Sequence, residues 1–155
     1  MNLSEAKAIF FQYDGSHFYM SRDGVDSQYA EINIPKETES LWLEELTSMK
    51  VESLKSSGNW SAIHFFINHD DHRHIENIMA VQPKGKLWEK CAFLEEYLKY
   101  ISIFEKSFSV SVREKALQYI LEHSNGLFSS SRSVDSRKRI QSIITETNNQ
   151  LSKLD

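Results

Sequence analysis

The five glycines and two prolines of this chain lie between segments whose apolar residues recur at helical spacing. Apolar residues three and four positions apart lie on one face of an α-helix, and glycine and proline disfavour the interior of a helix. These residues therefore divide the chain into about seven helices. The sequence predicts an all-α fold, either an irregular bundle or a short helical array of the HEAT or armadillo kind.

Several of the predicted helices have recognisable ends. Ser4 can cap the first helix and Gly15 can end it, because a hydroxyl satisfies free amide groups and glycine tolerates the left-handed conformation. Ser111 and Glu114 have the spacing of a capping box, and Gly126 follows as a stop. The predicted helices cover residues 4–13, 35–57, 60 to a break at 68–71, a short segment with Ile75, Ile78 and Met79 that Pro83 and Gly85 close, 87–104, 111–123 and about 134 onward.

Residues 14–34 form the longest stretch without helical periodicity, and we expect one long loop there. The stretch contains the dipeptide Asp-Gly twice, which is typical of turns. A hairpin over residues 8–20 is the alternative, because Ile9, Phe11 and Tyr13 also alternate along the chain as in a strand.

The helix over residues 87–104 is predicted to be the central one. Leu87, Cys91, Leu94, Leu98 and Ile101 hold a seven-residue repeat, and large aromatic residues flank this stripe. We expect neighbouring helices to cover so broad an apolar surface on more than one side. We therefore expect the single cysteine, Cys91, to be a small buried apolar residue and not a nucleophile.

The composition indicates a single globular domain over residues 1–155, with a core that needs no metal or disulfide. The formal net charge of −4 provides no general attraction to nucleic acid or to anionic lipid. One cysteine permits no intrachain disulfide, and we find neither a signal-peptide core nor an apolar run that could span a membrane. We expect a cytoplasmic protein.

Four of the six histidines lie between His64 and His74, beside several acids. On one continuous helix, His69, His72 and Glu76 would share a face and could bind zinc or another first-row metal. The apolar stripe fails after residue 67, however, which predicts a helix break over residues 68–71 and separates His69 from His72. The alternative is a solvated corner in which an aspartate, Asp70 or Asp71, caps the next helix.

A short basic run near the start of the last helix is the second candidate site. Its members are Arg132, Arg137, Lys138 and Arg139, preceded by four serines in five residues. Amide groups at a helix start together with these cations could hold a phosphate or an acidic segment. The simpler interpretation is that Ser133 or Asp135 caps the helix and that the cations are solvated.

The loop over residues 13–24 contains Ser16 and His17 near carboxylates, which is a possible hydrolytic set. Residues adjacent in sequence do not converge as a catalytic triad must, and no nucleophile-elbow pattern is present. We expect this loop to pack across helix ends.

No reaction centre stands out, so we expect a non-catalytic protein with no cofactor, which binds another protein through a groove between helices. A second copy of the chain is an alternative partner, whereas we do not expect a membrane or nucleic acid as a partner. The alternative functions are a metal-binding protein or metal-dependent hydrolase that uses the His64–His74 cluster, and a phosphate or nucleic-acid binder that uses Arg132–Arg139.

Overall fold

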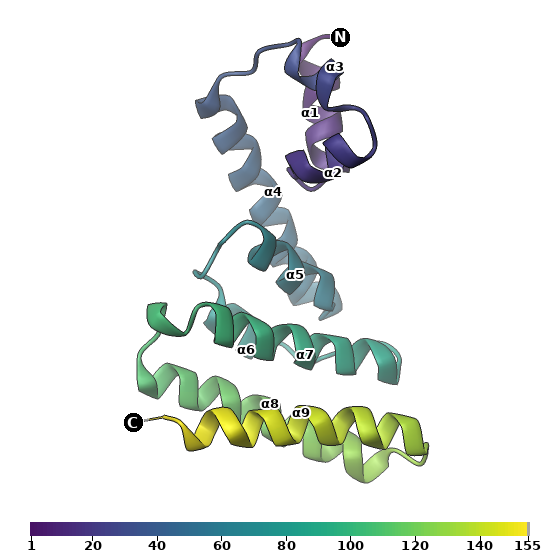
Figure 1. Ribbon diagram of the computed structural model, residues 1–155, viewed down its shortest axis with the longest axis vertical. Helices are drawn as coiled ribbons and strands as arrows, with labels where there is room; N and C mark the ends of the chain where they lie inside the picture. The colour runs from purple at the N-terminus through teal and green to yellow at the C-terminus, as the bar shows by residue number, and fades with distance from the viewer. Residues whose placement is uncertain (155) are drawn as a thin grey trace. The chain divides into compact units, whose positions relative to one another are not determined.

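The computed structural model describes residues 1–154, and every regular element in them is helical (Figure 1), which confirms the all-α prediction. These residues form nine α-helices and one 3-10 turn. The helices are α1 (Leu3–Gln12), α2 (His17–Arg22), α3 (Asp26–Ala30), α4 (Lys36–Ser57), α5 (Trp60–Asn68), α6 (Ile75–Met79), α7 (Leu87–Ile103), α8 (Val110–Ser130) and α9 (Val134–Ser152), with the turn η1 at Glu105–Ser107.

The chain divides into two compact units, Met1–Lys50 and Val51–Asp155, and the division falls inside α4. Each unit is described by itself below. The expectation of one domain over residues 1–155 stays a prediction.

In the first unit, the N-cap of α1 lies two residues before the predicted one. Asn2, and not Ser4, is the N-cap: its side chain accepts from the Glu5 amide, and the Glu5 carboxylate accepts from the Asn2 amide. This reciprocal pair satisfies two amide groups at the helix start. The buried ring of Phe10 packs against Trp42 of α4, with ring centroids 5.7 Å apart. The predicted apolar faces of these two helices therefore meet.

The predicted long loop over residues 14–34 is wrong in detail, because it contains the short helices α2 and α3. Ser16 caps α2 by accepting from the Tyr19 amide at 3.3 Å, and Gly24 separates the two helices with a φ of +76°. The hairpin alternative is also wrong. Helices of six and five residues are too short to display an apolar stripe, although one side chain, Met20, is fully buried.

In the second unit, α7 is the central helix, as predicted. It packs against α5, α6, α8 and α9, and Figure 1 shows it running beside α8 and α9. Its buried residues include all but the first member of the predicted stripe, together with the phenol rings of two tyrosines: Cys91, Leu94, Tyr97, Leu98, Tyr100 and Ile101. The broad apolar surface of this helix is thus covered on several sides.

Helix α8 differs from its prediction at both ends. It begins after Ser109, whose hydroxyl accepts from the Val112 amide, and it continues through Gly126 to Ser130. Glycine in a helix costs about 1 kcal/mol relative to alanine. The most extensive interhelical packing in this unit joins α8 to α9, and it outweighs that cost.

Candidate functional site

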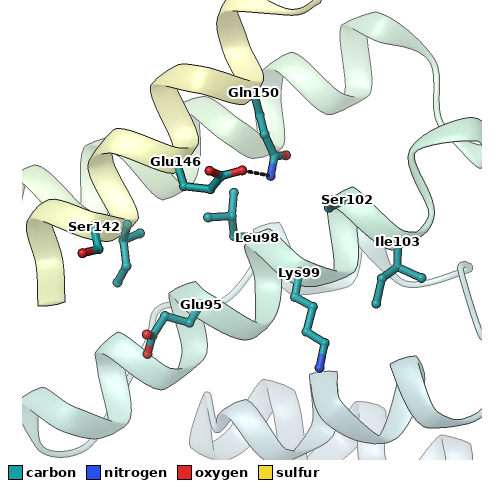
Figure 2. A pocket seen from close by; sticks show the side chains of 9 residues that line it. Glu95, Leu98, Lys99, Ser102, Ile103, Ser142, Glu146 and Gln150 are labelled. Atoms are coloured by element: carbon teal, nitrogen blue, oxygen red, sulfur yellow. Dashed lines mark hydrogen bonds between the residues drawn. The ribbon is translucent and has the colours of Figure 1, made fainter.

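A groove of about 390 Å³ lies between α7 and α9 in the second unit (Figure 2). Two turns of α7 and two turns of α9 form its walls. The lining residues are Glu95, Leu98, Lys99, Ser102, Ile103, Ser142, Ile143, Glu146 and Gln150.

Two of the lining residues are small and polar. Ser102 on α7 and Ser142 on α9 are both exposed, and they lie toward opposite ends of the groove (Figure 2). Leu98 points toward α9 and provides an apolar floor with Ile143, both at most 7% exposed. Ile103, at the end of the groove lining on α7, is 50% exposed.

Charged and polar groups form the rim. Arg139 donates from Nε to Glu95 at 2.9 Å, and this hydrogen bond raises the pKa of the Arg139 guanidinium above its ordinary value. Farther along α9, Gln150 donates to the Glu146 carboxylate at 3.2 Å. Lys99 points away from α9 on the opposite side of the groove (Figure 2). The rim therefore presents one carboxylate on α9, that of Glu146, and both a carboxylate, Glu95, and an ammonium group, Lys99, on α7.

The predicted metal ligands are placed apart by the helix break that the sequence indicated. His69 is the C-cap of α5, His72 is exposed in the following loop, and Glu76 lies in α6. Asp70 turns the chain with a φ of +53°, which ends α5 at the predicted position. No group of three or more His, Cys, Asp or Glu side chains that could hold a metal ion occurs in residues 1–154. Metal binding by this cluster stays a prediction.

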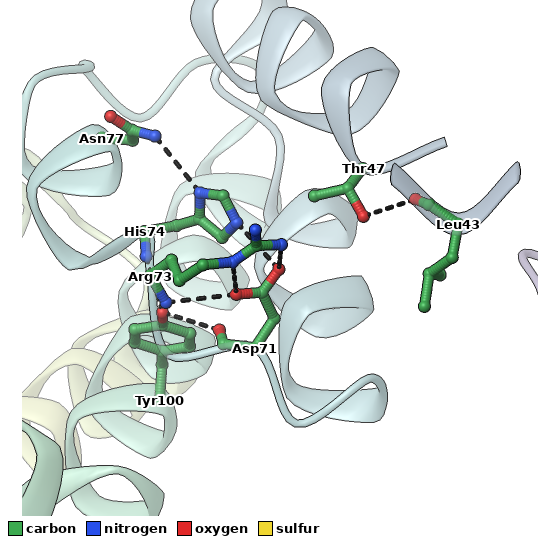
Figure 3. A network of polar contacts seen from close by, with 7 residues as sticks. All are labelled: Leu43, Thr47, Asp71, Arg73, His74, Asn77 and Tyr100. Carbon is green, nitrogen blue, oxygen red and sulfur yellow. Dashed lines mark hydrogen bonds and ion pairs between the residues drawn. The ribbon is translucent and has the colours of Figure 1, made fainter. Parts of the chain in front are cut away.

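The corner between α5 and α6 is solvated only in part: Asp70 and His72 are exposed as expected, but Asp71 and His74 are buried, which corrects the expectation for these two. His74 is 8% exposed and stacks on Phe66, with ring centroids 4.1 Å apart. Its Nε2 lies 2.9 Å from Asp71, and the Asn77 amide lies 3.2 Å from its Nδ1 (Figure 3). An Asn77 donor assigns the proton of a neutral ring to Nε2.

Neither aspartate caps α6, because His74 occupies the N-cap position without a side-chain cap. Burial opposes ionisation of the Asp71 carboxyl, but hydrogen bonds from Arg73 and His74 together lower its pKa well below the usual range. Each polar group in this network is thus engaged in holding the corner, and the network is structural.

The basic run does not converge on one site. Arg139 pairs with Glu95 of α7, and Arg137 lies over the Phe128 ring with 4.2 Å between guanidinium and centroid. Arg132 and Lys138 are exposed. Ser133 caps α9 by accepting from the Ser136 amide at 3.4 Å, as the simpler interpretation expected. Anion binding by this run stays a prediction.

The polar side chains near residue 17 serve packing within the first unit. Ser16 caps α2, and His17 Nε2 lies 3.2 Å from Glu39 of α4. Tyr29 donates to the same carboxylate at 2.5 Å, and burial, aided by Glu39, raises the pKa of its phenol. The Ser16 hydroxyl oxygen and His17 therefore have different partners, and the hydrolytic set is not assembled.

No protein-family model, curated protein or solved structure matches this chain. Within residues 1–154, the helices lack the combination of length and apolar character needed to cross a bilayer. The groove between α7 and α9 is the feature that sequence reasoning missed. Leu98 and Ile143 were predictable as stripe residues, but Ser102 and Ser142 look like ordinary surface serines until the two helices are paired.

Proposed function

We propose that this protein is a non-catalytic, cytoplasmic protein-binding module whose groove between α7 and α9 receives an amphipathic helix of another protein. The observation that supports this function is the groove itself, with an apolar floor of Leu98 and Ile143, an exposed Ile103 and a charged rim. Amphipathic helices bind such grooves by inserting apolar anchors spaced three and four residues apart.

The size of the groove suits the anchor residues of a helix. Small-molecule pockets span roughly 300–1,000 Å³, and a groove of about 390 Å³ lies at the lower end of that range. An open crease along two helices accepts a few apolar side chains from a ligand that stays largely outside. Ile103 would then be covered by the partner, which explains why an apolar side chain is half exposed there.

The charges on the rim indicate the chemistry of the partner helix. Glu146 accepts from the neutral Gln150, and among residues 1–154 no cation is seen paired with it. Lys99 is exposed on the opposite side. A helix with a lysine or arginine beside Glu146 and an acid beside Lys99 would complement both. Such pairs fix orientation and selectivity more than affinity.

Selection from a displayed library of helical peptides tests this function. The wild-type protein alone is the target of the selection, and the variant Ile103→Glu is used afterwards to test where the selected peptides bind. We expect enrichment of amphipathic peptides with a basic residue on one flank. Their binding should shift the methyl resonances of Leu98 and Ile143.

Val134→Glu is the matched control, because Val134 is 68% exposed and does not line the groove. The selected peptides should bind this control as tightly as the wild type and bind Ile103→Glu at least tenfold more weakly. Peptides that bind all three proteins equally would contradict the proposal. Concentration-dependent dimers in sedimentation that Ile103→Glu alone dissociates would instead identify a second copy as the occupant.

A further inference from the structure

A second, smaller pocket of about 80 Å³ lies where α7, α8 and α9 approach one another. It is distinct from the groove, although Gln150 lines both. The other lining residues combine an apolar wall with two cations and one acid: Ile101, Leu117 and Leu154, then Arg113, Lys153 and Glu105.

Arg113 has an unusual environment. Its Nε is buried and has no hydrogen-bond partner among residues 1–154. A buried donor without an acceptor is costly, and a charged one more so, which makes a missing water or ion the ordinary explanation. The hydroxyls of Ser124 and Ser131 are also buried without partners, but neither serine lines this pocket. Of these three residues, Arg113 is the one that also lines the pocket.

We propose that this pocket binds a small monocarboxylate with a short apolar tail. A carboxylate accepts two parallel hydrogen bonds from a guanidinium, so it can satisfy the Arg113 Nε together with a neighbouring nitrogen. Lys153 adds a second positive charge. The site is separate from the groove of the proposed function and does not depend on it.

The rest of the lining selects among anions. Ile101, Leu117 and Leu154 offer apolar surface to a tail, which inorganic phosphate lacks. Glu105 brings a negative charge and so disfavours a dianion. One water needs roughly 10–15 Å³ on the measure that gives this pocket about 80 Å³, so the pocket has room for several waters, admits an ion such as butyrate and excludes a nucleotide.

Titration of the full chain with butyrate, at constant ionic strength, tests the site. We expect saturable shifts of the Ile101, Leu117 and Leu154 methyl resonances, with a Kd of roughly millimolar for so small a ligand. Butyramide has the same shape without the charge and should produce no saturable shift. Equal responses to the two compounds, or none to butyrate, would overturn the proposal.

Two arginine variants identify the cation. Arg113→Gln should weaken butyrate binding at least tenfold, and Arg132→Gln, the same change at an exposed arginine outside the pocket, should leave it unchanged. Unchanged binding by Arg113→Gln would overturn the proposal.

Because Arg113→Gln could fold poorly, Glu105→Gln provides a second test at an exposed position. Removing its charge should tighten butyrate binding severalfold, and unchanged or weaker binding would refute the site.

Discussion

Tyr100 on α7 donates a hydrogen bond to the backbone carbonyl of Asp71, with 2.8 Å between the oxygens. The same hydroxyl accepts from the His74 amide at 3.0 Å, so a single buried phenol satisfies two backbone groups of the loop between α5 and α6. Burial raises the pKa of this phenol, which keeps its proton available for donation. The connection is therefore fixed to the central helix of its unit.

Asp71→Asn should destabilise the protein by about 1–3 kcal/mol at pH 7, because Arg73 and His74 lose a charged acceptor. The pKa of Asp71 is lower in the folded state than the ordinary value of about 3.9, so its ionisation stabilises the fold above that pH. This contribution is lost as the pH falls through the folded pKa. Urea unfolding at pH 7, 4 and 3 should show the gap between wild type and variant shrinking below about pH 4.

Asp70→Asn is the matched control for this pH dependence. Asp70 is exposed, and asparagine tolerates its positive φ, so the substitution should change stability little at any of these pH values. A gap for Asp71→Asn that stays constant from pH 7 to pH 3 would show that the ionised carboxylate is not what stabilises the corner.

Gly126→Ala should stabilise the protein by about 0.5–1 kcal/mol, because alanine restricts the unfolded chain and favours the helix. Gly126 lies inside α8, and an added Cβ would meet no atom within 4 Å. Thermal or urea unfolding measures the change. Lower stability would mean that the chain leaves the helical conformation at this residue.

Gly58→Ala should destabilise the protein by about 2 kcal/mol or more, since left-handed backbone strain and a steric clash add together. Gly58 has a φ of +55°, and an added Cβ would lie 2.3 Å from the carbonyl oxygen of Gln82. Gly24→Ala is the control, with a φ of +76° and open space around the added atom. Equal losses for the two variants in urea unfolding would contradict the clash.

The thiol of Cys91 should react with a disulfide reagent orders of magnitude more slowly in the native protein than in urea. Cys91 is 1% exposed, so the reagent cannot reach the sulfur easily. Burial also raises the pKa of the thiol, so little of the reactive thiolate is present. Colorimetric thiol titration with and without urea measures the two rates. Comparable rates would show that α7 opens readily.

The longer helices were predictable because each one buries a continuous stripe. In α7 the repeat that includes Leu94 and Leu98 marks the face that meets its neighbours. In α5 the N-cap Asn59 accepts from the Ala62 amide, and the stripe stops at the observed end. Local chemistry and tertiary packing agree in both helices, so the pattern alone was sufficient.

The differences have tertiary causes. Helices α2 and α3 are shorter than two helical turns, and α8 passes through Gly126 because its packing against α9 outweighs intrinsic propensity. The groove depends on which turn of α7 faces which turn of α9. That register depends on how the two helices pack together, so it cannot be predicted from the sequence of either helix alone.

Gln150 lines both the groove and the pocket beside Arg113. A ligand that breaks the hydrogen bond from the Gln150 amide to Glu146 moves a side chain that lines both sites. Thermodynamic linkage then requires reciprocity: by whatever factor an occupied groove alters the affinity for an anion, the bound anion alters the affinity for the helix. If both proposed ligands bind, Gln150 is a side chain through which occupancy of one site would change the affinity of the other.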